Sequence, residues 1–311
     1  MSMSADLPIT LVEPVHLPAA PTGPVLRVEA LRKSFGKRVV LQSVDWNVPA
    51  GRVIGLLGRN GAGKTTLLRC LLGLSPIDGG RVEVLGEPMT EPGGERMHRI
   101  GFVPQTFDLF PWMKVRAYLD FTAAFYTRWD HTLTARLLES WQLDPKQKIG
   151  QLSQGQRQKL AIVRAIAPQP DLLVLDEPVA SLDPQARRAF MTELLSLMRQ
   201  PGKTVIFSTH ITADLERAGA DIALLRDGRI QFMRPLAELR ESFVRAVFSR
   251  PGGWPHTPEV AGLLKASASD TEMHMLLEDA DLGALHTLAS ELGASLRIET
   301  PSLEDLFVEL A

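Results

Sequence analysis

Residues 58–65 read Gly58-Arg59-Asn60-Gly61-Ala62-Gly63-Lys64-Thr65, and this stretch decides the fold. It follows a short apolar segment, Val53 to Leu57, and opens a segment with helical apolar spacing that continues to Leu72. The pattern G-x-x-x-x-G-K-[ST] between a strand and a helix is typical of a phosphate-binding loop. Its glycines let backbone N–H groups turn towards phosphate oxygens, and the helix N-terminus adds positive potential. The stretch therefore predicts a nucleotide-phosphate site.

A second motif supplies the acidic groups that such a site needs. An unbroken apolar run, Leu172 to Leu175, ends in Asp176-Glu177. Lys64 is expected to reach the β- and γ-phosphates, while Thr65 and Asp176 are expected to hold Mg²⁺. Glu177 is suited to orient and deprotonate the attacking water as a general base. Together the two motifs predict hydrolysis of a nucleoside triphosphate.

Strands and helices alternate outward from these motifs, which favours an α/β fold with a mainly parallel sheet. The residue pattern predicts a hairpin turn at Asp227-Gly228 and strands at 26–30, 39–48, 81–85 and 204–207. Residues 1–24 form a Pro-rich leader, and a domain boundary is expected near 235–243. The remaining residues predict a small α+β domain with strands at 244–248, 272–277 and 296–300 and helices at 282–292 and 303–310.

Composition narrows the classes of function. The chain has 311 residues, enough for about two domains of about 150 residues each. Its net charge of −2 gives no basic field for nucleic acid. A single cysteine, Cys70, excludes a disulfide framework and favours a reducing cytoplasm. No apolar run is long enough to span a membrane, so any membrane role is expected to depend on a partner. Of the seven histidines, the six other than His210 show no ligand spacing, so no zinc site is expected.

Four further motifs occur in a fixed order along the chain. Gln105 ends the segment 101–105, and Leu152-Ser153-Gln154-Gly155-Gln156 opens a helix shortly before Asp176-Glu177. Ser181-Leu182-Asp183 follows, and His210 comes after Ser208-Thr209. This ordered set resembles the ATP-binding cassette (ABC) family, whose signature motif is usually L-S-G-G-Q. The resemblance covers roughly residues 26–235.

The resemblance implies a P-loop NTPase fold. A RecA-like core with an antiparallel β subdomain and a helical signature-motif subdomain, about 106–165, is expected within residues 25–238. A small accessory domain, 239–311, is expected to follow. Gln154 departs from the family pattern, because a glycine there permits closer backbone approach to phosphate.

The resemblance also implies roles for individual residues. The residues expected to act in catalysis are Glu177, His210, Lys64 and Gln105. Of these, His210 is expected to contact the γ-phosphate and Gln105 to sense Mg²⁺. Thr65, Gln105 and Asp176 are the expected metal residues. The residues expected to bind ATP, with Phe35 stacking on adenine, are Phe35, Gly58, Asn60, Gly61, Ala62, Gly63, Lys64, Thr65, Thr66, Ser153, Gly155, Gln156 and Asp183.

By resemblance, the chain is expected to be the ATPase subunit of a transporter. It would form a head-to-tail homodimer with two ATP molecules at the interface, and power a separate transmembrane permease on the cytoplasmic face of the inner or plasma membrane. The ending Pro301 to Phe307 looks like the tail of export ATPases. The alternative is a soluble ABC-type ATPase that acts on nucleic acid or ribosomes. The chain has a single phosphate-binding loop motif and no long heptad repeat of a coiled coil, and both observations argue against this alternative. The aromatic residues Phe107, Phe110 and Trp112 either pack the helical subdomain or line a groove for a partner's helix.

Overall fold

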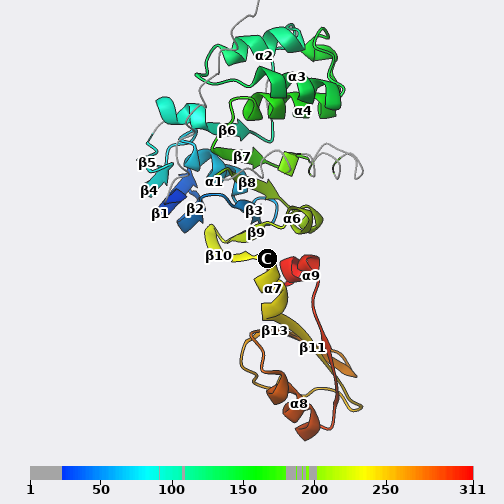
Figure 1. Ribbon diagram of the computed structural model, residues 1–311. Helices are drawn as coiled ribbons and strands as arrows, with labels where there is room; N and C mark the ends of the chain where they lie inside the picture. The colour runs from blue at the N-terminus through cyan, green and yellow to red at the C-terminus, as the bar shows by residue number, and fades with distance from the viewer. Residues whose placement is uncertain are drawn as a thin grey trace, which may run out of the picture.

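The computed structural model describes residues 23–90, 92–106, 109–179, 187, 191, 194–195 and 202–310. Figure 1 shows three regions along the molecule: a group of helices at one end, a central sheet, and a C-terminal α/β region at the other end. The nucleotide motifs lie in the central region. Each region follows from a different pattern of apolar residues.

The central sheet has six strands in the order β10-β9-β3-β8-β7-β6. From β6 to β9 neighbouring strands pair in parallel, and only β10 runs antiparallel, to β9. The predicted, mainly parallel sheet is therefore confirmed, as is the hairpin at Asp227-Gly228. The strands are β3 (Val53–Leu57), β6 (Ile100–Val103), β7 (Leu172–Asp176), β8 (Thr204–Thr209), β9 (Asp221–Arg226) and β10 (Arg229–Pro235).

Apolar side chains cover both faces of this sheet. Leu172 and Val174 belong to one hydrophobic core, while Leu173 and Leu175 belong to the other. Successive side chains of a strand point to opposite faces, so a strand between two cores needs an unbroken apolar run. This explains why the sequence before Asp176 shows no polar alternation.

A second, antiparallel sheet lies beside the central one, with strand order β2-β1-β4-β5. Helix α1 (Lys64–Leu71) shares one core with strands of both sheets, and Cys70 is buried in that core. The strands are β1 (Pro24–Phe35), β2 (Arg38–Pro49), β4 (Gly79–Val84) and β5 (Glu87–Pro88). A 3-10 helix, η1 (Glu95–Arg99), leads into β6.

The helical group contains α2 (Val115–Ala123), α3 (His131–Ser140), η2 (Ile149–Gln151) and α4 (Gln154–Ile166). Its apolar faces pack on the side of the central sheet opposite α1. Helix α6 (Thr212–Ala218) follows β8. Across the part of the chain that the structure describes, no helix combines the length and apolarity required to cross a membrane.

The C-terminal region forms a third sheet, in the order β12-β13-β11-β14, whose strands pair antiparallel. Helix α7 (Leu236–Ser242) occupies the segment where the sequence suggests a boundary. Strand β12 is an addition to the predicted elements; its exposed edge position leaves no apolar alternation to detect it by. The elements are β11 (Phe243–Ser249), β12 (Leu263–Ala268), β13 (Glu272–Glu278), α8 (Leu282–Glu291), β14 (Ser295–Glu299) and α9 (Leu303–Leu310).

The last helix, α9, returns to the central region (Figure 1). Leu303 and Leu306 are buried in the same core as Leu57, the last residue of β3. Arg245 of β11 is ion-paired with Glu309, at 2.7 Å, and this contact ties the helix to the third sheet. The C-terminal helix therefore contacts both the accessory sheet and the core that supports the phosphate-binding loop.

Candidate nucleotide-hydrolysis site

The phosphate-binding loop lies between the end of β3 and the start of α1. Gly63 is the N-cap of α1 with a φ of 102°, a backbone conformation that residues with a Cβ rarely adopt. A Cβ on Gly58 would lie 2.7 Å from the carbonyl oxygen of Leu225, so this position also requires glycine. The loop is thus shaped by the glycines at its two ends. Its backbone amides and the α1 N-terminus are suited to bind phosphate.

Lys64 is the buried cation of the loop. Its side chain is 6% exposed, and its Nζ donates to the carbonyl oxygens of Gly58 at 2.8 Å and Arg59 at 3.3 Å. Burial lowers the pKa of Lys64, while the negative charges of Glu177 and Asp176 act in the opposite direction. A desolvated ammonium beside a glycine-rich loop attracts phosphate oxygens strongly, because water screens it little.

Asp176 is the most buried carboxylate of the site, with 1% of its surface exposed. Its Oδ1 accepts a 2.6 Å hydrogen bond from the Ser208 hydroxyl. Its Oδ2 is buried and, among the described residues, has no hydrogen-bond partner. A buried carboxylate oxygen without a donor is costly and is suited to a cation or its bound water. Asp176 and Thr65, the second residue of α1, therefore fit a Mg²⁺ site on the chemistry of their oxygens.

Glu177 lies between two partners that the sequence assigns to catalysis. Its Oε1 is 3.8 Å from the Lys64 Nζ and 3.4 Å from the His210 Nδ1. Its backbone has a φ of 48°, unusual for a residue other than glycine, and its N–H donates to the Ser208 Oγ at 2.9 Å. The structure thus brings Lys64, Asp176, Glu177 and His210 together, at the carboxyl ends of β7 and β8 and the start of α1.

The signature residues lie elsewhere, at the start of α4 in the helical group (Figure 1). Ser153 is the N-cap: its Oγ accepts from the Gln156 N–H at 3.2 Å, and its own N–H donates to the Gln156 Oε1 at 2.9 Å. This reciprocal pair is a capping box, which fixes the helix start. Gln154 is exposed and Gly155 half-buried, so the side chain that replaces the usual glycine faces solvent.

Of the other predicted site residues, Phe35 and Gln105 are exposed, and some fall outside the described residues. Phe35 ends β1 with an exposed ring, and the Lys33 Nζ lies 5.1 Å from its centroid. Gln105 is exposed two residues after β6. The motif Ser181-Leu182-Asp183 and the aromatic residue Phe107 lie outside the described residues.

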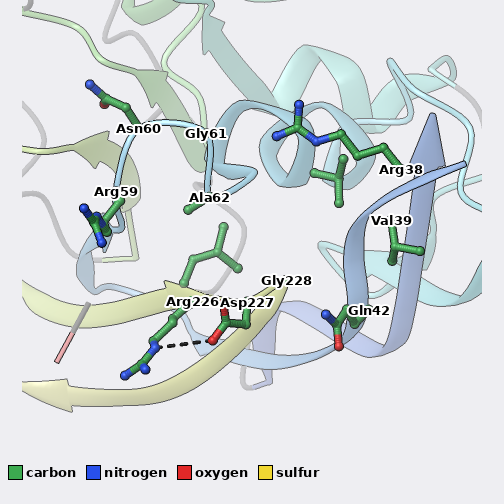
Figure 2. Close-up of a pocket in the computed structure, with 12 residues that line it drawn as sticks. Arg38, Val39, Gln42, Arg59, Asn60, Gly61, Ala62, Arg226, Asp227 and Gly228 are labelled. Carbon is green, nitrogen blue, oxygen red and sulfur yellow. Dashed lines mark ion pairs between the residues drawn. The ribbon is translucent and has the colours of Figure 1, made fainter. Parts of the chain in front are cut away.

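A polar cavity of about 490 Å³ lies beside residues 59–62 of the loop. Figure 2 shows the residues that line it. Three segments far apart in sequence line it: the start of β2, residues 59–62 of the loop, and the turn between β9 and β10. Arg38 and Arg59 contribute positive charge from two of these segments. Neither arginine nor Ser208 stands out as a site residue in the sequence. Only the position of Ser208, near the end of a buried strand and two residues before His210, could have indicated it.

Comparisons with known proteins identify the family of this chain. The family model described as ABC transporter matches residues 41–180. The Nod factor export ATP-binding protein I of Burkholderia lata is 39% identical over 204 residues, covering 64% of this chain and 67% of that protein. The protein of that name from Rhizobium sp. strain N33 is 34% identical over 290 residues, covering 90% of this chain and 94% of that protein.

The chain belongs to the ABC transporter family. It is an ATP-binding subunit and an ATPase, as the resemblance implied. The alternative of an ABC-type ATPase acting on nucleic acid or ribosomes is not favoured, since these relatives are named for export.

Solved structures support the same assignment. The structure titled "ATP binding subunit of ABC transporter" has a TM-score of 0.61 and 27% identity, and the match covers 70% of this ABC ATPase and 92% of that chain. A dimeric post-hydrolysis structure of the ATP-binding cassette MJ0796 with ADP and Pi has a TM-score of 0.60 and 25% identity. That match covers 68% of this chain and 98% of the other. The predicted P-loop NTPase fold is confirmed.

Proposed function

We propose that this ABC ATPase hydrolyses Mg·ATP as a homodimer and thereby powers export through a separate membrane subunit. The observation that carries the catalytic part is the cluster in which Glu177 Oε1 lies 3.8 Å from the Lys64 Nζ and 3.4 Å from the His210 Nδ1. A carboxylate held between a buried cation and an imidazole can accept a proton next to a bound phosphate.

In the proposed reaction, the phosphates of ATP occupy the loop 58–65. Lys64 exchanges its carbonyl contacts for oxygens of the β- and γ-phosphates and stabilises the charge that develops there. Glu177 takes a proton from water, the water oxygen bonds to the γ-phosphorus, and the bond to the β–γ bridging oxygen breaks to give ADP and phosphate. His210 holds the γ-phosphate and the water. Thr65, Asp176 and Gln105 would hold Mg²⁺, which would neutralise phosphate charge when bound.

Two copies are needed to complete each proposed site. Ser153 and Gly155 begin α4 in the helical group, whereas the Lys64–Glu177 cluster lies at the central sheet. In a head-to-tail dimer these signature residues of one copy cap the ATP bound to the other, and Asp183 links the two sites. The solved structures of MJ0796 are dimeric, which supports a dimer for this chain. ATP then contributes to the interface and stabilises the closed dimer by mass action.

The adenosine part of ATP is proposed to lie between Phe35 and residues 59–62 of the phosphate-binding loop. The cavity of Figure 2 adjoins Asn60, Gly61 and Ala62, and supplies polar surface there. Thr66 and the partner copy's Gln156 complete the proposed set of nucleotide contacts. Phe35 has its ring exposed, as a stacking platform requires.

An exposed aromatic surface on the helical group is the proposed contact with the membrane subunit. Four aromatic rings contact one another in a row, and the centroids of neighbouring rings lie 5.1–6.0 Å apart. In order along the row they belong to Trp112, Phe110, Phe121 and Phe125. Trp112 is 71% exposed and Phe125 64% exposed. Large adjoining aromatic side chains in solvent are typical of an interaction surface. Phe110 also follows Gln105 by five residues, which places the contact near the catalytic segment.

Export is proposed because the relatives are named for export of Nod factor. The membrane subunit would hold this ATPase on the cytoplasmic face of the membrane. We also propose that residues 25–238 form the ATPase unit and 239–311 an accessory domain. Of the Pro-rich leader expected at 1–24, residues 1–22 lie outside the described residues. The cargo is chosen by the membrane subunit in this proposal.

Affinity purification of the tagged chain from detergent-solubilised membranes of its native cell tests the transport part. A polytopic membrane protein should be recovered in stoichiometric amount. Trp112→Ala should reduce that recovery, whereas Val308→Ala, which truncates a 70% exposed apolar side chain on α9, should not. Equal recovery with both variants would contradict the proposed contact surface, and recovery of ATPase with no membrane protein would contradict the transporter role.

A further inference from the structure

The Ser208 hydroxyl joins the two acidic residues of the site. It donates to the Asp176 Oδ1 at 2.6 Å and accepts from the Glu177 N–H at 2.9 Å. We infer that Ser208 is a positioning residue for ATP hydrolysis, which orients the Asp176 carboxylate towards the metal and holds the Glu177 backbone in its catalytic conformation. This inference rests on the roles proposed above for those two residues.

The first part concerns the Asp176 carboxylate. Ser208 is fully buried and pairs directly with Asp176 in the parallel register of β7 and β8. Because Oδ1 is bound to the hydroxyl, rotation of the carboxylate is restricted and Oδ2 keeps a defined direction. Oδ2 is the buried oxygen that has no partner among the described residues. Hydrogen-bonded partners of this kind commonly set the orientation and affinity of a metal-binding carboxylate.

The second part concerns the Glu177 backbone. A φ of 48° is unfavourable for glutamate, by about 1–3 kcal/mol for such conformations in general, and persists only where neighbouring contacts stabilise it. The hydrogen bond from the Glu177 N–H to the Ser208 Oγ is such a contact. It fixes the peptide unit from which the Glu177 side chain extends to Lys64 and His210.

The third part concerns the end of β8, where Ser208 and His210 lie close together in sequence. Ser208 lies two residues before His210, at the same end of β8. One strand end therefore positions the metal carboxylate, the general base and the imidazole together. A hydroxyl is suited to this role, since it can donate and accept at once.

The experiment removes this hydroxyl and compares it with another on the same strand. Thr204, at the other end of β8, is equally buried, and its Oγ1 accepts from the Gly51 N–H at 2.9 Å. Ser208→Ala and Thr204→Val each delete one buried hydroxyl, but only the first lies at the site. Ser208→Thr restores a hydroxyl, and Ser208→Cys fills the space with a weak donor.

Two readouts distinguish positioning from a purely structural role. One is the dissociation constant of Mn²⁺ from the protein–ADP complex, followed by the loss of free Mn²⁺ signal in electron paramagnetic resonance. The other is the kcat and KM of ATP hydrolysis. Ser208→Ala and Ser208→Cys should weaken Mn²⁺ binding by about 10–100-fold and lower kcat by about 10-fold or more, with KM within about 3-fold. Ser208→Thr should recover most of both, and Thr204→Val should match the wild type.

Wild-type Mn²⁺ affinity and kcat in Ser208→Ala would overturn the inference. If that variant does not fold, the same values in Ser208→Cys would overturn it, as would equal losses in Thr204→Val. Failure of the proposed function looks different: Asp176→Asn and Glu177→Gln would then hydrolyse ATP normally. With those two variants inactive and Ser208→Ala normal, the proposed function stands and the role of Ser208 is refuted.

Discussion

Truncation of Leu306 to alanine tests whether α9 is an integral part of the ATPase fold. Leu306 is 3% exposed and lines an apolar notch with Leu303, Phe307 and Leu57, the residue directly before the phosphate-binding loop. At the start of the helix, the Ser302 hydroxyl accepts from the Asp305 N–H at 3.1 Å and donates to the Asp305 carboxylate at 2.8 Å. The substitution deletes the central buried side chain without altering these polar contacts.

The expected loss follows from the packing. The notch has only about 10 Å³ of free space, so the wild-type side chain fills it. The three carbon atoms removed correspond to about 2.4 kcal/mol of transfer free energy at about 0.8 kcal/mol each. A residual cavity brings the usual range for buried Leu→Ala to about 2–5 kcal/mol. Because a surface helix can shift inward and reduce that cavity, we expect a loss of about 3 kcal/mol in the free energy of unfolding.

Urea unfolding followed by circular dichroism measures this loss. Val308→Ala is the matched control, since Val308 lies on the same helix, is 70% exposed and should change the free energy of unfolding by less than about 0.5 kcal/mol. Equal unfolding midpoints for the two variants would refute the docking of α9 on the core. A loss in Leu306→Ala confined to the unfolding of residues 239–311, measured by hydrogen exchange, would show that the helix stabilises only the accessory sheet.

Three other substitutions test the nucleotide site. Lys64→Ala removes the buried ammonium and should weaken ATP binding by about 10–100-fold in calorimetric titration, as expected for a lost hydrogen bond to a charged group; unchanged affinity would exclude its phosphate role. Glu177→Gln should leave ATP binding intact, slow hydrolysis by about 100-fold or more and accumulate an ATP-bound dimer in gel filtration. If this variant stays entirely monomeric with ATP, the proposed head-to-tail dimer is contradicted. Ser153→Arg should prevent that dimer without weakening ATP binding to the monomer, and a large loss of monomer affinity would mean that the motif acts within one chain.

Local sequence determined the elements that carry the site. The loop 58–65 is recognisable because its glycines, lysine and threonine are adjacent, and each has a fixed position relative to one strand and one helix. The apolar run Leu172–Leu175 predicts a strand buried on both faces. This prediction is confirmed, because its side chains belong alternately to the two hydrophobic cores. Strand β12 lacked such a signal, because an exposed edge strand needs no apolar periodicity.

Contacts across strands required the tertiary structure. Ser208 and Asp176 are 32 residues apart and meet only because β7 and β8 pair in a particular register. The arginine-lined cavity combines three distant segments, and α9 reaches the core of the phosphate-binding loop from the far end of the chain. The sequence by itself predicted hydrolysis of a nucleoside triphosphate, because each motif for that chemistry is contiguous, and its resemblance to the ABC family implied that the nucleotide is ATP. Strand pairing and packing alone decided which buried hydroxyl, cavity and helix support those motifs, because such contacts depend on distances in space that residue spacing does not specify.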